Sequence, residues 1–442
     1  MNICLFEDHA CEDLLPLVHL RPVWELRCGV DTLLEKLLRV YPDARVTLFC
    51  REHLRAAAEE RSGLPVPSSA LTGEQLFINA RVPVTGPLPA LDRGPDRSGR
   101  AGEGRLREGP GKSPVTGRMC LQGESVLYAR LSGGREAGLT PDLFLSGDLP
   151  RRLRSLGAQE VQAGPERAGP VQAAIRYPWD LIEDLDTRIR DDILCRGGTG
   201  DLRGRWEGAL LLEPSGVRLG EGSRLMPGCT VNAETGPVYI GERVMVYPGA
   251  YLQGPCAVGS GCVIRPGARI SGSSLGPVCK VGGEVEESVL QGYANKQHDG
   301  FLGHSYVGSW CNLGAGTSGS NLKNTYGTVR VPLHGVPTDT GTLFAGLFMG
   351  DHVKTGINTS FNTGTLVGVM AGITGPGFPP TFIPSFVWGG ARGFEPYDLN
   401  RALETAGRMM ARRNRVLTPV ERSLIEHVYR LTAPERELQG IL

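Results

Sequence analysis

The chain has 442 residues, more than one ordinary hydrophobic core needs, so two or three folded units are expected. Its 47 basic and 47 acidic residues cancel, which leaves no field of one sign to attract nucleic acid or a membrane surface. The 62 glycines and 32 prolines indicate many tight turns between short strands.

The first residues, 1–8, contain neither a basic region nor a long apolar run, so they do not form a signal peptide. No apolar run in the chain approaches the roughly 20 residues that span a bilayer. The 11 cysteines are odd in number and never spaced C-x-x-C, so neither a disulfide framework nor a zinc ribbon is expected. These features predict a cytoplasmic protein with reduced, mostly buried thiols.

The N-terminal part alternates short apolar runs with helical patterns. Strands are expected at 2–6, 45–50, 76–79 and 125–131, and a helix at 31–40. Strands separated by helices predict an α/β domain, which we place at residues 1–195. Residues 86–118 are rich in Gly, Pro, Arg and Asp and interrupt this domain as a flexible insertion.

Beyond residue 200 an aliphatic side chain recurs every six residues. The repeat is unbroken from Ile240 to Ile270 and resumes, after an irregular stretch, at Phe301, Val307 and Leu313. A period of six fits neither a helix nor an alternating strand, but it fits a triangular solenoid in which each side takes one hexad. The sequence therefore predicts a left-handed parallel β-helix over 200–390. Cysteines at 229, 256, 262 and 311 occupy the small-residue positions of this repeat and are expected inside the coil.

The last segment, 391–442, returns to a helical pattern. Amphipathic helices are expected at 398–414 and 418–431. Thr418-Pro419-Val420-Glu421 has the residues of a capping box with proline at the first helical position.

The densest polar segment, 293–326, lies where the six-residue repeat is interrupted and restarts. His298 is the candidate catalytic group, because a neutral imidazole accepts a proton near pH 7. In Gly314-Ala315-Gly316 the small side chains would let the Ala315 amide approach a ligand oxygen. A surface histidine bonded to backbone is the alternative for His298, and His304 is equally compatible with a second polar wall or with packing.

This segment resembles the acetyltransferase half of the bifunctional N-acetylglucosamine-1-phosphate uridyltransferase/glucosamine-1-phosphate acetyltransferase family. The whole chain is similar to a variant in which an atypical sugar-nucleotidyltransferase domain precedes the β-helix. The resemblance is carried by residues 295–304 (NKQHDGFLGH) and 312–317 (NLGAGT), and it covers nearly all of the chain outside 86–118.

The resemblance implies an acetyl-CoA-dependent N-acetylation of an amino-sugar phosphate. His298 would take a proton from the attacking amine, with Asn312 fourteen residues later, and the Ala315 amide would steady the thioester oxyanion. Asn312 and Asn321 would hold the sugar, and Arg265 its phosphate. The family also implies a homotrimer that binds CoA between subunits.

The chain departs from the family pattern at several of these positions. Phe301 and Leu322 stand where the family has substrate-contacting tyrosines, and a phosphate-binding lysine is missing from 284–287. We name Lys296 and Lys323 as candidates to replace that lysine. We therefore expect the chemistry to be retained and the acceptor to differ from the family's.

The N-terminal domain lacks the Gly-rich loop of ordinary sugar nucleotidyltransferases. Arg21, which precedes Pro22, and Arg27 are candidate contacts for the phosphates of UTP or another NTP, with salt-bridged arginines as a nearly equal alternative. Asn79 ends a strand where ordinary enzymes carry a metal-binding Asp. Glu7 and Asp8 remain as candidate ligands for Mg²⁺ if this domain is active.

Three hypotheses follow. The chain is a bifunctional enzyme of nucleotide-sugar biosynthesis of the UDP-N-acetylglucosamine type, or an acyltransferase whose N-terminal domain only binds sugar nucleotide, or a non-catalytic trimeric β-helix for assembly. The missing loop and metal ligand favour the second over the first, and the motif around His298 argues against the third. No nucleic-acid or membrane partner is expected.

Overall fold

The structure is a computed structural model that describes residues 1–89, 91, 115–162 and 173–441. It divides into two compact units, one of Met1–Ala10 with Lys36–Ala174 and one of Cys11–Glu35 with Ile175–Leu442. Residues 11–35, which the sequence placed in an N-terminal domain of 1–195, are thus grouped with the β-helix. Most of the expected insertion, 90 and 92–114, lies outside the described residues. In the part that is described, no helix has the length and apolar character to cross a membrane.

The first unit is built on a mixed six-stranded sheet in the order β2-β1-β3-β5-β4-β6. β1, β2 and β3 are parallel, β5 is antiparallel to β3 and β4, and β6 is parallel to β4. The strands are β1 Asn2–Phe6, β2 Arg45–Phe49, β3 Gly73–Asn79, β4 Val115–Gln122, β5 Ser125–Gly133 and β6 Gln159–Gln162. The helices are α1 Leu33–Val40, which starts in the second unit, α2 Arg55–Ser62, α3 Pro141–Phe144 and α4 Leu149–Leu156, with 3₁₀ turns η1 His9–Leu14, η3 Glu52–Leu54 and η4 Arg135–Ala137.

Buried aliphatic and aromatic side chains explain the position of β1 between β2 and β3. All residues of β1 after Asn2 are buried, as expected for a parallel strand covered on both faces. The rings of Phe77 and Phe144 stack at 4.5 Å, and Phe6 lies 4.6 Å from Phe144 between their centroids. The insertion expected at 86–118 does not extend to residue 118, because residues 115–118 are the start of β4, where Val115 and Met119 join this core.

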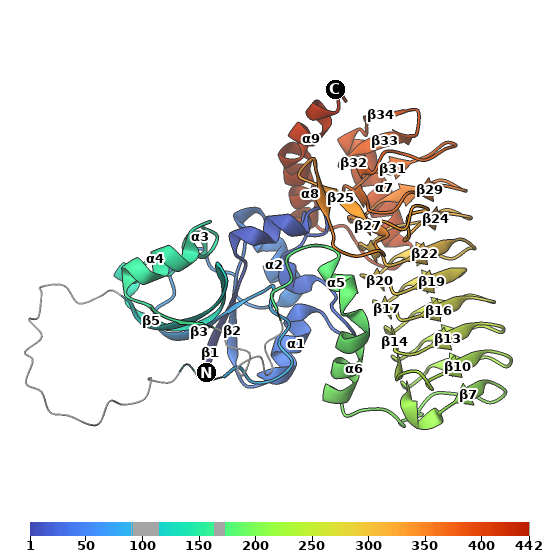
Figure 1. The fold of residues 1–442 in the computed structure, drawn as a ribbon, viewed down its shortest axis with the longest axis horizontal. Coiled ribbons are helices and arrows are strands. Elements are labelled where there is room, and N and C mark those ends of the chain that lie inside the picture. Colours follow the sequence, from blue (N-terminus) through green and yellow to red (C-terminus); the bar gives the residue numbers. More distant parts are fainter. Residues whose placement is uncertain (90, 92–114, 163–172, 442) are drawn as a thin grey trace, which may run out of the picture. The chain divides into compact units, whose positions relative to one another are not determined.

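The second unit is a parallel β-helix of three stacked sheets, drawn in Figure 1 as the ladder of short strands from β7 to β34. One sheet contains β7 Leu210–Leu212, β10 Thr230–Asn232, β13 Tyr251–Gln253, β16 Arg269–Ser271, β19 Glu284–Glu286, β22 Phe301–Gly303, β24 Ser318–Gly319 and β29 Ser360–Phe361. The next contains β8 Val217–Leu219, β11 Val238–Ile240, β14 Cys256–Val258, β17 Ser274–Leu275, β20 Val289–Leu290, β23 Tyr306–Val307, β27 Leu347–Met349, β30 Thr365–Val367 and β32 Phe382–Ile383. The third side, here called the third face, contains β9 Arg224–Leu225, β12 Met245–Val246, β15 Val263–Ile264, β18 Lys280–Val281 and β21 Asn295–Lys296, followed by β28 Lys354–Thr355, β31 Gly372–Ile373, β33 Val387–Gly390 and β34 Gly393–Pro396.

The six-residue repeat is confirmed by the register of these strands. Ile240 pairs with Val258, Val246 with Ile264, and Leu252 with Ile270, so that each coil advances by 18 residues. All six of these side chains are at most 1% exposed and belong to one continuous core. The cysteines at 229, 256, 262 and 311 are buried in the same core, and ten of the eleven cysteines are buried free thiols.

The coil contracts in the irregular stretch after Ile270. Four residues separate β15 from β16, but only Gly282 and Gly283 separate β18 from β19. The repeat then restarts one residue later than the sequence indicated, because Leu302 and not Phe301 enters the core. Lys296 stands in register with Val281 at an inward-facing position and is 2% exposed.

Helices and hairpins complete the second unit. They are η2 Val23–Glu25, α5 Asp180–Glu183, α6 Leu185–Cys195, η6 Pro214–Gly216, the antiparallel hairpin of β25 Arg330–Leu333 and β26 Val336–Asp339, and α7 Leu399–Ala411, α8 Pro419–Leu431 and α9 Ala433–Leu438. The expected capping box at Thr418 is present, since its side chain accepts from the Glu421 N–H and the Glu421 carboxylate accepts from the Thr418 N–H. At the C-terminal end of the coil, β34 runs antiparallel to β33, and Arg436 of α9 donates to the Ser385 carbonyl.

Candidate functional site

A pocket of about 420 Å³ lies on the β-helix at the turns that follow the third face. Four turns at this corner supply its walls, and they bring together three residues that the sequence singled out, namely Arg265, His298 and Ala315. The remaining lining residues are Pro266, Gln297, Asp299, Gly316, Ile357 and Asn358. His298 is exposed, and within the described residues its imidazole has no hydrogen-bond or ion-pair partner. An accessible, unpaired imidazole can accept a proton from a bound ligand.

The contraction at Gly282-Gly283 explains why the His298 turn has its position. A Cβ on Gly282 would stand 2.4 Å from the Gln297 carbonyl oxygen, and one on Gly283 would stand 2.8 Å from the His298 carbonyl oxygen. Gly283 also has φ +69°, in the left-handed region that favours glycine. The short turn without side chains therefore leaves room for the turn of the next coil, residues 297–300, to settle against it.

Lys296 holds that turn from beneath. Its buried Nζ donates to the carbonyl oxygens of Gly282 at 3.1 Å, His298 at 3.1 Å and Gly300 at 2.6 Å. Burial lowers the pKa of Lys296 to about 8, although the nearby carboxylates of Asp299 and Glu284 act in the opposite direction. The ammonium is thus committed to the backbone around His298, which contradicts the expectation that Lys296 replaces a phosphate-binding lysine.

The Gly-Ala-Gly turn presents a backbone amide to the pocket. Gly316 has φ +74°, and its N–H donates to the Asp299 carbonyl at 3.0 Å. The Ala315 carbonyl accepts from the Asn358 N–H at 2.7 Å, whereas the Ala315 N–H donates to no acceptor among the described residues. The turn is therefore fixed on both sides while one N–H stays available to a ligand.

Asn312 lies beside the pocket and does not line it. It bridges Asn295 on one coil and Lys354 on the other, and its Oδ1 accepts from the Asn295 Nδ2 at 3.4 Å. Asn295 in turn accepts a hydrogen bond from Arg413 Nη2 at 2.6 Å. Asn312 thus belongs to a row of polar residues on the third face, between Asn295 and Lys354, and it directly precedes Leu313 and the Gly-Ala-Gly turn.

Asn321 and Lys323 are found at another corner of the coil. The Asn321 Nδ2 lies 2.9 Å from His304 Nδ1, and His304 Nε2 lies 3.0 Å from the Glu287 carboxylate. Because the Asn321 amide donates, Nδ1 accepts and Nε2 carries the proton that Glu287 accepts. The His304 ring also stacks on Phe344 at 5.0 Å, so both ends of the segment around the β25–β26 hairpin are fastened to this histidine. Lys323 is half-buried and donates to the Thr328 carbonyl. Neither Asn321 nor Lys323 lines the pocket.

The two arginines expected to bind nucleotide phosphates lie in the second unit. Arg21 is buried and forms an ion pair with Asp351 at 2.5 Å. The Arg27 N–H donates to Gln291 Oε1 and to the Tyr306 hydroxyl, both at 2.9 Å, and its guanidinium donates to the Val30 carbonyl. Both residues are buried and fasten segment 11–35 within this unit, so Arg21 is salt-bridged as the alternative has it, but neither is a surface arginine.

The candidate metal ligands of the first unit are occupied by arginines. Glu7 is fully buried and accepts from Arg51 Nε at 3.1 Å and Nη2 at 3.0 Å. Asp8 accepts from Arg81 Nε at 2.7 Å and Nη2 at 2.6 Å, and the Asn79 amide donates to it at 2.8 Å. A carboxylate bound by a guanidinium fork is neutralised and lacks free oxygens for a cation. The described residues also hold no group of three or more His, Cys, Asp or Glu side chains arranged for a metal, so these residues do not fit a Mg²⁺ site.

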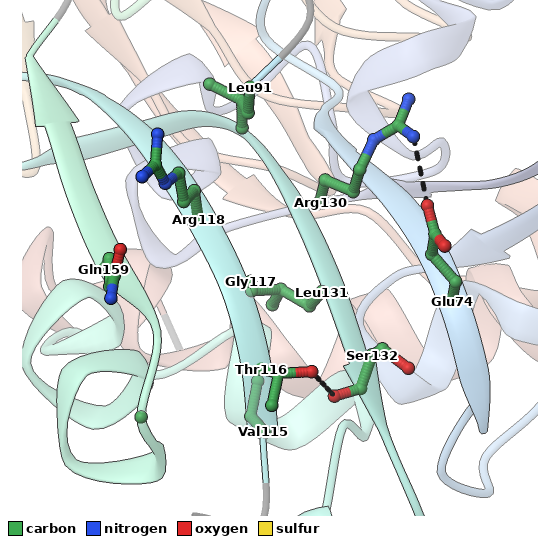
Figure 2. Close-up of a pocket in the computed structure, with 11 residues that line it drawn as sticks. Glu74, Leu91, Val115, Thr116, Gly117, Arg118, Arg130, Leu131, Ser132 and Gln159 are labelled. Carbon is green, nitrogen blue, oxygen red and sulfur yellow. Dashed lines mark hydrogen bonds and ion pairs between the residues drawn. The ribbon is translucent and has the colours of Figure 1, made fainter. Parts of the chain in front are cut away.

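A second pocket, of about 560 Å³, lies on the sheet of the first unit (Figure 2). Arg118 of β4 and Arg130 of β5 extend from neighbouring strands, and Arg130 donates to Glu74 of β3 at 3.0 Å. Glu74 is near the start of β3, whereas Asn79 is its last residue. None of the residues singled out from the sequence lines this pocket.

Four lining residues of the first pocket were not foreseen, namely Gln297, Asp299, Ile357 and Asn358. The first two flank His298 and could have been found from the sequence as parts of the same turn. Ile357 and Asn358 are more than 40 residues later, and only the stacking of β28 on the coil of Asn312 brings them to the site.

The comparisons with known proteins match both units. Residues 3–91 match a family described as sugar nucleotidyl transferase, and residues 237–272 match the bacterial transferase hexapeptide (six repeats) family. The bifunctional protein GlmU of Acidovorax ebreus is 31% identical over 170 residues, 37% of this chain and 33% of that protein. GlmU of Thermus thermophilus is 26% identical over 271 residues, 49% of this chain and 59% of that protein.

The chain spans about a third to three fifths of the length of these relatives. Among solved structures, the UDP-N-acetylglucosamine acyltransferase of Francisella novicida matches 53% of this chain and 77% of that one, at 16% identity and a TM-score of 0.28. The chain thus resembles the bifunctional GlmU proteins at modest identity, with a sugar nucleotidyl transferase match over residues 3–91 and hexapeptide repeats in the β-helix.

Proposed function

We propose that the β-helix transfers an acyl group, in the first instance acetyl, from CoA to the amine of an amino-sugar phosphate. The observation that carries this proposal is the pocket shared by the unpaired imidazole of His298 and the unbonded N–H of Ala315. A base and an oxyanion donor in one cleft are the two groups that aminolysis of a thioester requires. The GlmU-like relatives support a place in nucleotide-sugar biosynthesis of the UDP-N-acetylglucosamine type.

The reaction begins when the lone pair of the neutral acceptor amine attacks the thioester carbon, and the carbonyl oxygen becomes an oxyanion that the Ala315 N–H stabilises. As the N–C bond forms, the nitrogen becomes acidic and gives one proton to the His298 imidazole. The C–S bond breaks, the CoA sulfur leaves with the electron pair, and the imidazolium returns its proton to that sulfur. The products are an N-acyl sugar phosphate and free CoA. Removing one donor of this kind from an enzyme lowers kcat by about 10²–10³.

Arg265 is the residue of the pocket that we assign to the acceptor phosphate. Its planar guanidinium can form two parallel hydrogen bonds to phosphate oxygens. We do not assign this role to Lys296 or Lys323, whose ammonium groups donate to backbone carbonyls. Asn312 and Asn321 lie outside the pocket walls, and we propose at most an indirect contribution for Asn312 through its row on the third face.

For the first unit we propose a non-catalytic role as a sugar-nucleotide binding or scaffolding domain. This proposal is supported by the arginines that occupy Glu7 and Asp8 and by the position of Arg21 and Arg27 in the other unit. A UTP-dependent transfer needs a metal-binding carboxylate, and the residues named for it do not fit one. Incubation with UTP, Mg²⁺ and N-acetylglucosamine-1-phosphate should release no pyrophosphate, and release above background would restore the bifunctional hypothesis.

We also propose a homotrimer, by analogy with β-helices that bind CoA between subunits. Ile357, which lines the pocket and is 73% exposed, is compatible with a neighbouring subunit covering this wall. Sedimentation equilibrium of the full chain should give three times the chain mass of 47.4 kDa, and a monomer would contradict the proposal.

The test of acyl transfer uses acetyl-CoA and glucosamine-1-phosphate with continuous detection of free thiol. Wild-type protein should release CoA, whereas His298→Ala should lower the rate by about 10²–10⁴, the usual contribution of a general base. His334→Ala is the matched control, because this half-exposed histidine lies outside the pocket. Equal rates for wild type and His298→Ala would remove acyl transfer by this histidine.

A further inference from the structure

Three cations gather on the third face next to the pocket, and a fourth lies at their edge. Lys280 of β18 is paired in register with Asn295, and Arg413, from the linker between α7 and α8, donates to the Asn295 side chain at 2.6 Å. Arg412 precedes it in the linker. Arg265 lies one coil before, where its backbone N–H donates to the carbonyl of Val281, the neighbour of Lys280. We call Lys280, Arg412 and Arg413 the basic cluster, with Arg265 at its rim.

The charges of the cluster act on one another. Partial burial lowers the pKa of Lys280, and the positive charges of Arg413, Arg412 and Arg265 lower it further. The pKa of Arg413 is also lowered, by burial and then by Arg412. Like charges that lie close enough to lower one another's pKa destabilise the protein when no ligand is bound.

No carboxylate compensates the cluster. Among the described residues, none of these four cations forms an ion pair. Glu284, on the next strand of the neighbouring sheet, is paired with Arg269 at 2.7 Å. Asp299 lines the pocket beside Arg265 and His298, so negative charge is present on the pocket side and not on the Lys280 side. The Arg413 Nε is buried and has no acceptor within the part of the chain that the structure describes.

A simpler explanation accounts for only part of the cluster. Arg412 and Arg413 follow the last turn of α7, and cations are favoured at a helix C-terminus. That preference does not explain Lys280, which comes from a different element, or the folding of the linker onto the third face through Asn295. Positive charges from two chain segments about 130 residues apart thus lie together on one surface.

We propose that Lys280, Arg412 and Arg413 bind a phosphate group of a ligand whose reacting end lies in the His298 pocket. Phosphate oxygens would accept from the two guanidinium forks and from the Lys280 ammonium, and would neutralise their mutual repulsion. The position beside Arg265 makes the cluster an extension of the pocket, so its assignment to a substrate of acyl transfer rests on the proposed function. Two sources share this chemistry, the phosphates of CoA and the phosphate of an amino sugar.

The test measures binding to the full chain by calorimetry at low ionic strength, with inorganic pyrophosphate, coenzyme A and glucosamine-1-phosphate as separate probes. The variant Lys280→Gln/Arg413→Gln should bind at least one probe at least tenfold more weakly than wild type. Arg224→Gln/Arg401→Gln is the matched control, because it removes two exposed charges, one on β9, three strands before β18 in the same sheet, and one in the first turn of α7. Arg412→Gln changes an exposed side chain that packing does not require, and should weaken binding of the same probe severalfold.

The three probes separate the sources and keep the two proposals apart. A loss of affinity for coenzyme A alone assigns the cluster to the acyl donor. A loss of affinity for glucosamine-1-phosphate alone assigns it to the acceptor. Equal affinities of the double variant and its control for all three probes overturn the site. Because no turnover is needed, a wild-type protein that releases no thiol but binds phosphate through Lys280 and Arg413 would remove the acyl transfer and leave the phosphate site.

Discussion

Lys296 offers the sharpest test of how the coil holds its candidate base. Methionine at this position has a similar length and keeps the apolar stem, but it removes the ammonium that donates to the carbonyls of Gly282, His298 and Gly300. We expect the 297–300 turn of the Lys296→Met variant to lose these three hydrogen bonds, so that His298 is no longer held in position. Lys296 is in this sense a positioning residue, since it acts on His298 through the backbone.

The expected change in the free energy of unfolding of Lys296→Met follows from two opposed contributions. Hydrogen bonds from a charged donor contribute about 1.5–3 kcal/mol each, and the variant loses three. The pKa of Lys296, lowered by burial from 10.5 to about 8, corresponds to roughly 3 kcal/mol spent on keeping the charge inside the protein, which methionine recovers. The net loss in the free energy of unfolding is therefore on the order of 3 kcal/mol.

Lys354→Met is the matched control for this variant. Burial lowers the pKa of Lys354 to about 8 as well, and its Nζ donates to the carbonyls of Trp310 and His352 at the preceding corner, away from the pocket. Both variants should lose stability in chemical denaturation. Only Lys296→Met should also lower kcat for thiol release, by at least tenfold, with the KM for acetyl-CoA little changed, as expected for a misplaced base.

The pH dependence of the unfolding free energy tests whether Lys296 is charged inside the protein. The folded pKa near 8 lies below the unfolded value, so between about pH 8 and 10.5 the unfolded chain binds more protons and stability rises with pH. The difference in unfolding free energy between wild type and Lys296→Met should thus shift in favour of wild type by about 1 kcal/mol from pH 7 to pH 9. A Lys296→Met protein as active as Lys354→Met at the same folded fraction would refute the positioning role.

Three further predictions concern the surroundings of the site. Gly282→Ala should lower thiol release without unfolding the coil, because its Cβ would meet a carbonyl oxygen of the His298 turn at 2.4 Å, and normal activity would contradict the packing argument. His304→Ala should destabilise the protein by about 1–3 kcal/mol in denaturant melts, since it strands the Asn321 amide, but should keep the His298-dependent activity; an activity loss beyond the unfolded fraction would give His304 a role in the reaction. Arg21→Met should cost about 3–5 kcal/mol because it leaves Asp351 buried without its cation, and a stable variant with weakened UTP binding would instead support the nucleotide role.

The sequence was sufficient for those parts of the fold that repeat or that are local. The hexads from Ile240 to Ile270 predicted the coil, and the residues at Thr418 predicted the start of α8, because each signal lies within a few residues of the structure it specifies. The pocket residues Arg265, His298 and Ala315 were also identified correctly as neighbours, since the solenoid places successive turns above one another.

The errors arose where a side chain finds a partner far along the chain. Lys296 and Arg21 carry charges that suited a phosphate, and nothing nearby in the sequence showed that backbone carbonyls or Asp351, 330 positions away, would satisfy them. The two-residue contraction at Gly282-Gly283 shifted the repeat, so Phe301 was placed in the core in place of Leu302. A periodic pattern cannot show where the coil shortens until the stacking of its strands is known.

The antiparallel strand β34 has a consequence for how copies of the protein can join. A parallel coil whose last strand were bare could add the first strand of another copy and grow into a filament. Here the final strand of that side runs in the opposite direction, and α9 is bonded to the turn after β32 through Ser385. A blocked end disfavours head-to-tail growth, which leaves the flanks of the coil for the homotrimer that we propose.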